Sequence, residues 1–230
     1  MSRPDYGLDA PGVVLGLPLA GLAVLAGALL LAPYPALVGA GALLLLLGAA
    51  TYVSSRRGKL RLRDRLLDQL ALRGDERVLD VGCGRGLLLV GAAKRLSTGT
   101  ASGLDLWVQA DQLHNGRAAA LDNAAAEGVA ERVQVVDGDM RHMPFADASF
   151  DLVVSNLAIH NVPSQAGRQS SISEIVRVLK PGGRVALMDL AFTAQYADWL
   201  RSAGLVDVQR TWPARWFFPP LGIVQGKKPD

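Results

Sequence analysis

The chain has 230 residues, half of them hydrophobic, and a formal net charge of +3. Six basic residues and one acidic residue lie within residues 54–65, which leaves 18 basic and 20 acidic residues elsewhere. The rest of the chain has no basic surplus, and we predict no nucleic acid partner. The single cysteine, Cys83, excludes an intramolecular disulfide and a cysteine-rich metal site.

Two uncharged segments, residues 13–32 and 36–53, follow a tail of residues 1–12. As helices, both are long enough to cross about 30 Å of hydrocarbon. Helices packed on a soluble protein normally show a polar stripe, whereas these segments are apolar all round. We predict a transmembrane helical hairpin over residues 13–53. A helical pair buried in a soluble protein is the alternative.

A secretory signal is a competing interpretation of the first apolar segment. Such a signal needs a basic leader and one short apolar core, whereas Arg3 is offset here by Asp5 and Asp9. Within the first segment, small residues three or four positions apart would permit close packing of two helices, and the abundance of such residues is the alternative explanation of this spacing. These residues are Gly16, Ala20, Ala23 and Gly27.

A basic linker, residues 54–72, follows the second apolar segment. Its cations are Arg56, Arg57, Lys59, Arg61, Arg63 and Arg65. They predict an integral membrane protein with both termini and the following domain on the cytoplasmic side. Contact with anionic lipid, worth about 1 kcal/mol per cation, is an equal alternative to a plain topology signal. The linker ends in an amphipathic helix, whose apolar face holds Leu62, Leu66, Leu67 and Leu70.

Residues 78–81 then form a predicted buried strand that runs into a turn with Gly82, Gly84 and Gly86. Glycines let the backbone take positive φ and approach a ligand closely. A helix expected over residues 87–96 points its N-terminus at the same spot. The turn therefore predicts a nucleotide-like cofactor, although the dinucleotide fingerprint would require glycine at position 87.

Strand and helix patterns alternate through residues 73–230, which predicts one α/β domain with helices on both faces of a parallel sheet. The last two strands have no helix between them and must therefore pair antiparallel. Predicted strands cover residues 77–81, 101–105, 133–137, 150–155, 184–190, 206–211 and 221–227.

The turn sequence D-V-G-C-G-R-G resembles the first motif of class I S-adenosylmethionine-dependent methyltransferases. Further matches follow in order: Gly103-Leu104-Asp105-Leu106-Trp107, Gly138-Asp139-Met140, the segment of residues 150–156 and the L-K-P-G-G-R sequence of residues 179–184. The resemblance implies a Rossmann-like, seven-stranded, mostly parallel sheet with an antiparallel last strand. Residues 155–161 lack the Asn/Asp-Pro-Pro-aromatic sequence of base and protein-glutamine methyltransferases. They are similar to the ubiquinone-biosynthesis and small-molecule type.

The resemblance also implies a site for S-adenosylmethionine. Asp105 would bind the ribose hydroxyls, unless it only caps a helix beginning near Val108. Asp139 would lie near the adenine, and Asp80 would order the turn and contact the methionine end. Trp107 either covers the adenine or packs. The expected cofactor residues are Asp80, Gly82, Cys83, Gly84, Gly86, Asp105, Leu106, Asp139, Met140 and Asn156.

His160 is the candidate catalytic residue, because neutral imidazole accepts a proton near pH 7. A histidine that only holds its loop is an equal alternative, and His114 and His142 have less to recommend them. No Asp, Glu and His cluster has ligand spacing, and we predict no required metal.

These features predict a membrane-anchored methyltransferase that acts on a small acceptor by direct in-line transfer. A bilayer concentrates lipophilic molecules, so the expected acceptors are a prenylated quinone, an isoprenoid, a lipid or an apolar thiol. The apolar segment between the last two strands either lines the entrance or packs on the domain; it holds Trp212, Trp216, Phe217 and Phe218, with Pro219 and Pro220. The alternatives are a catalytically idle cofactor-binding scaffold of a membrane complex and an NAD-dependent oxidoreductase. The methylated atom (O, S, N or C) and the oligomeric state stay open.

Overall fold

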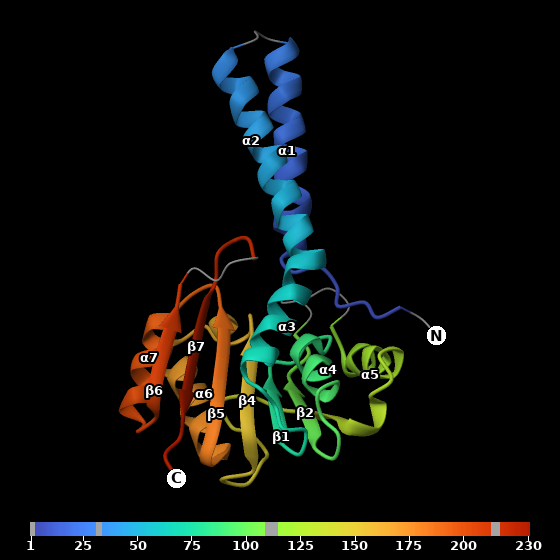
Figure 1. Ribbon diagram of the computed structural model, residues 1–230. Helices are drawn as coiled ribbons and strands as arrows, with labels where there is room; N and C mark the ends of the chain where they lie inside the picture. Colours follow the sequence, from blue (N-terminus) through green and yellow to red (C-terminus); the bar gives the residue numbers. More distant parts are fainter. Residues whose placement is uncertain (1–2, 31–33, 109–114, 213–216) are drawn as a thin grey trace.

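The computed structural model describes residues 3–30, 34–108, 115–212 and 217–230. Helices α1 (Pro11–Leu30) and α2 (Pro35–Val53) form a hairpin that projects from an α/β domain (Figure 1). Helix α2 continues through a π-helical turn, η1 (Ser54–Gly58), into α3 (Lys59–Gln69). One continuous helix therefore joins the hairpin to the domain.

The domain holds a seven-stranded sheet with the order β3-β2-β1-β4-β5-β7-β6. Its strands are β1 (Arg77–Val81), β2 (Thr100–Asp105), β3 (Val133–Asp137), β4 (Phe150–Asn156), β5 (Leu179–Asp189), β6 (Val206–Thr211) and β7 (Gly222–Lys227). Strands β1 to β5 pair in parallel, and β7 pairs antiparallel with both β5 and β6. The predicted sheet and its antiparallel end are confirmed.

Strand β5 begins at Leu179, five residues before the predicted strand at residues 184–190. The added residues pair with β4 across a shift in register. Leu179 pairs with Phe150, and Gly182 takes a φ of 71°. The Gly182 N–H donates to the Lys228 carbonyl oxygen, which keeps this bulged segment attached to the sheet.

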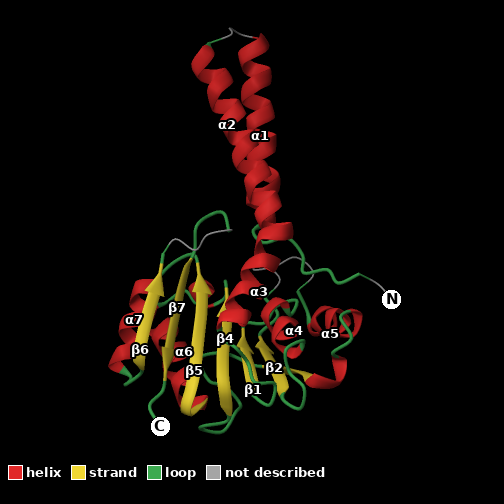
Figure 2. Cartoon of the chain, in the orientation of Figure 1, coloured by secondary structure: helices red, strands yellow, loops and turns green. Residues whose placement is uncertain are grey.

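Helices cover both faces of the sheet (Figure 2). One face packs on α3, α4 (Leu87–Ala93) and α5 (Arg117–Ala126), and the other on α6 (Gln165–Val178) and α7 (Thr193–Ser202). Neighbouring residues of one strand serve opposite faces, as Val78 and Leu79 of β1 do. Short helical turns η2 (Ala130–Arg132) and η3 (Ile159–Asn161) complete the domain. The apolar face predicted for the linker helix is confirmed, since its four leucines are buried.

The two hairpin helices meet through small residues, although not those of the predicted stripe. Gly21 lies so close to α2 that a Cβ atom there would be 2.9 Å from the Gly41 carbonyl oxygen. A Cβ atom at Gly16 or Gly27 would have nothing within 4 Å, so the predicted stripe of small residues lies on a side of α1 that does not face α2. The helices instead meet at seven-residue spacing, through Val14, Gly21 and Ala28 of α1.

Most of the hairpin surface is apolar and exposed. Leu19, Leu29 and Leu46 are 66%, 80% and 68% exposed. Both helices are long and apolar enough to cross a membrane, a criterion that core helices of soluble proteins and signal sequences also meet. A core helix would be mostly buried, whereas only a small part of each apolar helix here is covered.

Candidate functional site

One cavity of about 690 Å³ lies over the carboxyl ends of the parallel strands, where ligands bind in open α/β sheets. Nine of the predicted site residues line this central cavity: Gly82, Cys83, Gly84, Asp105, Leu106, Asp139, Met140, Asn156 and His160. The two others, Asp80 and Gly86, do not line it. The structure thus brings together residues from five separate stretches of sequence.

The glycine turn has the backbone that its sequence predicts. Gly82, Gly84 and Gly86 have φ values of 70°, 51° and 83°. A Cβ atom at Gly82 would lie 2.2 Å from the Ala158 Cβ, so this position excludes any side chain. The Gly82 N–H donates to the Leu104 carbonyl oxygen over 2.8 Å, which fixes the turn against the end of β2.

Asp105 joins the glycine turn to the end of β2. Its carboxylate accepts N–H bonds from Gly84 over 2.7 Å and from Trp107 over 2.6 Å. Each carboxylate oxygen has two lone pairs, so both keep capacity for further donors from a ligand. The alternative helix cap cannot be compared, since residues 109–114 lie outside the described residues. Trp107 donates from its indole Nε1 to Asp137 over 2.7 Å.

Asp80 lies beneath the turn and is only 2% exposed. Its Oδ2 accepts the Leu89 N–H over 2.9 Å at the start of α4, whereas Oδ1 has no hydrogen-bond partner among the described residues. Burial raises the pKa of Asp80 to about 7, the Leu89 N–H lowers it in part, and the nearby Asp105 charge adds to the rise. The expected hydrogen bond is present, and it anchors the helix that follows the turn.

Cys83 and Asp139 have opposite environments on the cavity wall. Burial raises the pKa of the Cys83 thiol well above its usual value, so this sulfur is not an activated nucleophile. Arg141 holds the pKa of Asp139 below its usual value through a hydrogen-bonded ion pair. Asp139 is thus an ionised acceptor at the end of the cavity that Gly138 and Met140 also line.

His160 is held by a partner that the sequence reasoning missed. Its Nδ1 lies 2.5 Å from Oδ1 of Asp189, a residue at the end of β5 that is 1% exposed. Asp189 Oδ2 also accepts the His160 backbone N–H and the Tyr196 hydroxyl, over 3.1 and 3.2 Å. With Nδ1 turned to the carboxylate, the other ring nitrogen is the one that can accept a proton. Asp189 lies at the carboxyl end of a parallel strand, where site residues are expected, but no local sequence pattern links it to His160.

The far part of the cavity wall comes from outside the sheet. Three regions form it. The N-terminal segment contributes Tyr6, Asp9 and Ala10, and the segment before β7 contributes Phe217, Phe218 and Pro219. The hairpin base, which consists of the ends of α1 and α2 nearest the domain with η1 and the start of α3, contributes Val13, Val14, Thr51, Ser55 and Lys59. Of these residues, the sequence predicted only Phe217, Phe218 and Pro219, through the apolar segment before the last strand. Trp212 is 47% exposed and is absent from the lining, and Trp216 lies outside the described residues.

These residues fit the cofactor that the motifs imply. Asp105 retains free acceptor capacity toward the cavity, and Asp139 offers a second carboxylate farther along it. A cavity of about 690 Å³ is within the usual size of sites for nucleotide-sized molecules. Asp80 Oδ1 is buried and has no donor among the described residues. A positive charge bound above the turn would favour the ionised form of this carboxyl.

The comparisons with known proteins agree with the family that the sequence motifs imply. Residues 79–187 match the family described as "Methyltransferase domain". A ubiquinone/menaquinone biosynthesis C-methyltransferase, UbiE, of Ruegeria sp. is 36% identical over 129 residues, which are 56% of this chain and 48% of that protein. The 27-O-demethylrifamycin SV methyltransferase of Amycolatopsis mediterranei is also 36% identical, over 132 residues that cover 56% of this chain and 44% of the relative.

A solved structure shares the fold. Haemonchus contortus phosphoethanolamine N-methyltransferase 2, in complex with phosphomonomethylethanolamine and S-adenosylhomocysteine, superposes with a TM-score of 0.61 at 19% identity. The match covers 74% of this chain and 53% of that protein. The chain spans about half the length of the relatives that it matches in sequence.

Proposed function

We propose that this chain, whose residues 79–187 match the methyltransferase-domain family, is a membrane-anchored class I S-adenosylmethionine-dependent methyltransferase. It transfers the methyl group of S-adenosylmethionine directly to a small lipophilic or thiol acceptor. One observation carries the proposal: a single cavity joins the glycine turn and Asp105 to His160 and the hairpin base. An idle scaffold has no specific support, because the site residues are intact and lie together.

The cofactor would be held by the glycine turn and by the ends of the neighbouring strands. Asp105 would accept hydrogen bonds from the ribose hydroxyls, and the Gly82 and Gly84 backbone would allow close approach of the methionine end. Leu106, Asp139 and Met140 would hold the adenine, and Asn156, at the end of β4, would lie toward the methyl group. Gly86 and Asp80 act from below, because Gly86 permits the left-handed turn and Asp80 holds the start of α4.

S-adenosylmethionine, when bound, supplies a methyl group already activated by a positively charged sulfur. The chain therefore needs to align the acceptor, exclude water and receive a proton. His160 would receive it on the ring nitrogen opposite Nδ1. Asp189 fixes the ring through Nδ1 and stabilises its protonated form, which makes Asp189 a positioning residue.

The hairpin would anchor the enzyme in a bilayer with its domain on the cytoplasmic side. Exposed leucines along both helices support insertion, and the basic linker supports the orientation. Two of the predicted six membrane-surface cations are turned into the protein, since Lys59 and Arg63 are only 4% and 6% exposed. The exposed cations Arg56, Arg57, Arg61 and Arg65 remain on the linker surface.

The experiment is a calorimetric titration of the detergent-purified chain with S-adenosylhomocysteine. We expect micromolar binding that falls at least about tenfold in Asp105→Ala, because hydrogen bonds to a charged acceptor are worth about 1.5–3 kcal/mol. Asp198→Ala, on the exposed surface of α7, is the matched control and should bind as the parent does. Absence of binding to the folded chain would overturn the proposal.

A further inference from the structure

We propose that the hairpin base forms the acceptor-binding wall of the central cavity. It would receive an amphiphile whose apolar tail enters from the bilayer and whose nucleophilic head reaches His160. This inference rests on the proposed function and narrows its acceptor class from lipophilic molecules and thiols to tailed molecules. It also gives the membrane helices a role beyond anchoring.

The first support is the continuity of the cavity. The space lined by Gly84 and Asp105 is also lined by Val13, Val14 and Thr51 of the hairpin. Val14 is 4% exposed and Val13 is 47% exposed, so the wall runs from the covered interior to the open surface of α1. A ligand at His160 therefore has an apolar path toward the part of α1 that bears the exposed leucines.

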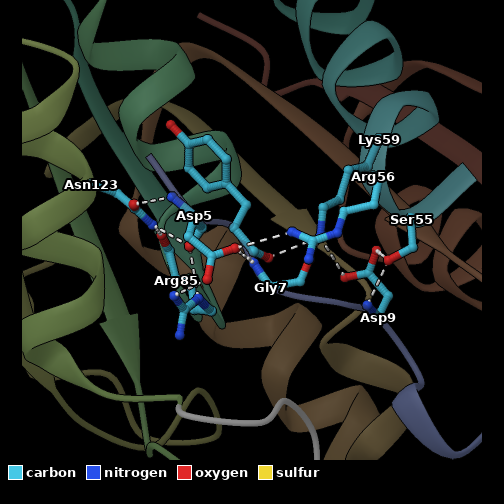
Figure 3. A network of polar contacts seen from close by, with 9 residues as sticks. Asp5, Gly7, Asp9, Ser55, Arg56, Lys59, Arg85 and Asn123 are labelled. Atoms are coloured by element: carbon cyan, nitrogen blue, oxygen red, sulfur yellow. Dashed lines mark hydrogen bonds and ion pairs between the residues drawn. The ribbon is translucent and has the colours of Figure 1, made fainter. Parts of the chain in front are cut away.

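The second support is that the polar groups of this wall are occupied by one another (Figure 3). Lys59 Nζ donates to the carbonyl oxygens of Tyr6 and Gly7, both over 2.8 Å, and lies 3.3 Å from Asp9 Oδ1. Ser55 Oγ accepts the Asp9 N–H over 2.7 Å and donates to Asp9 Oδ2 over 3.1 Å. With these polar groups paired with one another, the apolar side chains that the wall offers to a ligand are those of Ala10, Val13 and Val14.

The third support is a second apolar segment of the lining, formed by Phe217, Phe218 and Pro219. The Phe218 N–H donates to Ser54 Oγ over 2.7 Å, so this segment is tied to the π-helical turn below the hairpin. Phe218 is 36% exposed. Apolar residues of this segment thus line the cavity close to the turn where the hairpin meets the domain.

The part of the cavity around η3 carries the polar side chains of Asn156, His160 and Asn161 beside the apolar residues Leu157, Ala158 and Val162. Hydrogen-bonding groups near His160 and the apolar residues at the hairpin base together match a molecule with a compact reactive head and a tail. A small water-soluble acceptor would leave Val13 and Val14 uncovered. The distribution of lining residues therefore favours an amphiphile.

The test needs no knowledge of the natural acceptor. Analogues of S-adenosylhomocysteine with nitrogen in place of sulfur can carry an n-alkyl chain, from methyl to dodecyl, in the direction of methyl transfer. We expect affinity for the detergent-purified chain to rise by up to about fourfold per added methylene, the equivalent of about 0.8 kcal/mol of apolar burial. The rise should stop once the chain has passed the hairpin wall.

Two variants locate the tail. Val13→Asn should flatten the dependence on chain length and leave S-adenosylhomocysteine binding unchanged, whereas Leu15→Asn, on α1 but outside the cavity, should retain the dependence. Partition of the probes into detergent affects all variants equally and cancels in the ratio. Phe217→Ser tests the second apolar segment if Val13→Asn does not fold.

The outcomes separate the inference from the function on which it rests. Binding of S-adenosylhomocysteine without any dependence on alkyl length would overturn the acceptor wall and leave the methyltransferase proposal standing. Equal dependence in the parent, Val13→Asn and Phe217→Ser would also overturn it. Failure of S-adenosylhomocysteine itself to bind would instead contradict the proposed function.

Discussion

Replacement of Asp80 by asparagine should change how the stability of this protein depends on pH. Asp80 is 2% exposed, accepts one N–H from Leu89, and has a pKa of about 7 in the folded chain against 3.8 for an unperturbed aspartate. Between these values the unfolded chain has released the proton and the folded chain still holds it. Deprotonation therefore favours unfolding, and stability contributed at low pH is lost as pH rises toward 7.

The magnitude follows from the separation of the two pKa values. Each pH unit between them costs about 1.4 kcal/mol, and near the folded pKa the slope diminishes. The free energy of unfolding of the parent, relative to Asp80→Asn, should fall by about 2 kcal/mol from pH 5 to pH 7. Asparagine stays neutral and still offers a carbonyl oxygen to Leu89, so the comparison isolates the ionisation.

The assay is guanidinium unfolding of the detergent-solubilised chain, followed by tryptophan fluorescence at both pH values. Asp139→Asn is the control, because Arg141 lowers the pKa of Asp139 and this carboxyl is ionised in both states above pH 5. The difference in free energy of unfolding between Asp139→Asn and the parent should be the same at the two pH values. A constant difference for Asp80→Asn as well would refute the reasoning that burial keeps Asp80 protonated.

Two other predictions concern the cavity and the hairpin base. Cys83 is 5% exposed and its thiol pKa is raised, so it should react with a thiol reagent roughly a hundredfold more slowly in the folded than in the unfolded chain. Bound S-adenosylhomocysteine should slow this reaction further. Equal rates in the folded and unfolded chain would contradict the burial of Cys83. Lys59→Met should lower the free energy of unfolding by about 3 kcal/mol, because it leaves Asp9 without its cation, and Asp9→Asn in the same chain should restore part of it. Lys94→Met removes the cation of the exposed Lys94–Glu127 pair and should cost under about 1 kcal/mol in the same measurement. An equal loss in both variants would argue against a stabilising buried pair between Lys59 and Asp9.

Features set by neighbours in sequence could be predicted. Apolar runs with strand character gave all seven strands, and the spacing of Gly82, Gly84 and Gly86 gave a turn with three positive φ values. The carboxylate of Asp105 could be assigned to the site because a parallel strand ends there. In each case the information lies within a few residues.

Features set by contacts between distant segments could not. Asp189 is 29 residues from His160 in the chain, and only the pairing of β4 with β5 brings their ends together. The packing side of α1 was misassigned because glycine and alanine occur all round this helix, and only contact with α2 selects Gly21 and Ala28. Likewise, composition made Lys59 a surface cation, whereas the carbonyl oxygens of Tyr6 and Gly7 draw it inward.

One covalent connection, the unbroken helix through η1, joins the hairpin to the domain, and the N-terminal segment adds a second, non-covalent attachment. This segment hydrogen-bonds to Asn123 and Arg85 of the domain at Asp5, and to Lys59 and Ser55 at Asp9. A domain on a single flexible linker would swivel and tumble above its anchor. With this double attachment, the strand ends that carry the cavity stay turned toward the hairpin (Figure 1). In a bilayer, enzyme and acceptor would then meet by diffusion of the whole molecule within the membrane plane. The domain would not need to reorient before an acceptor could enter the cavity.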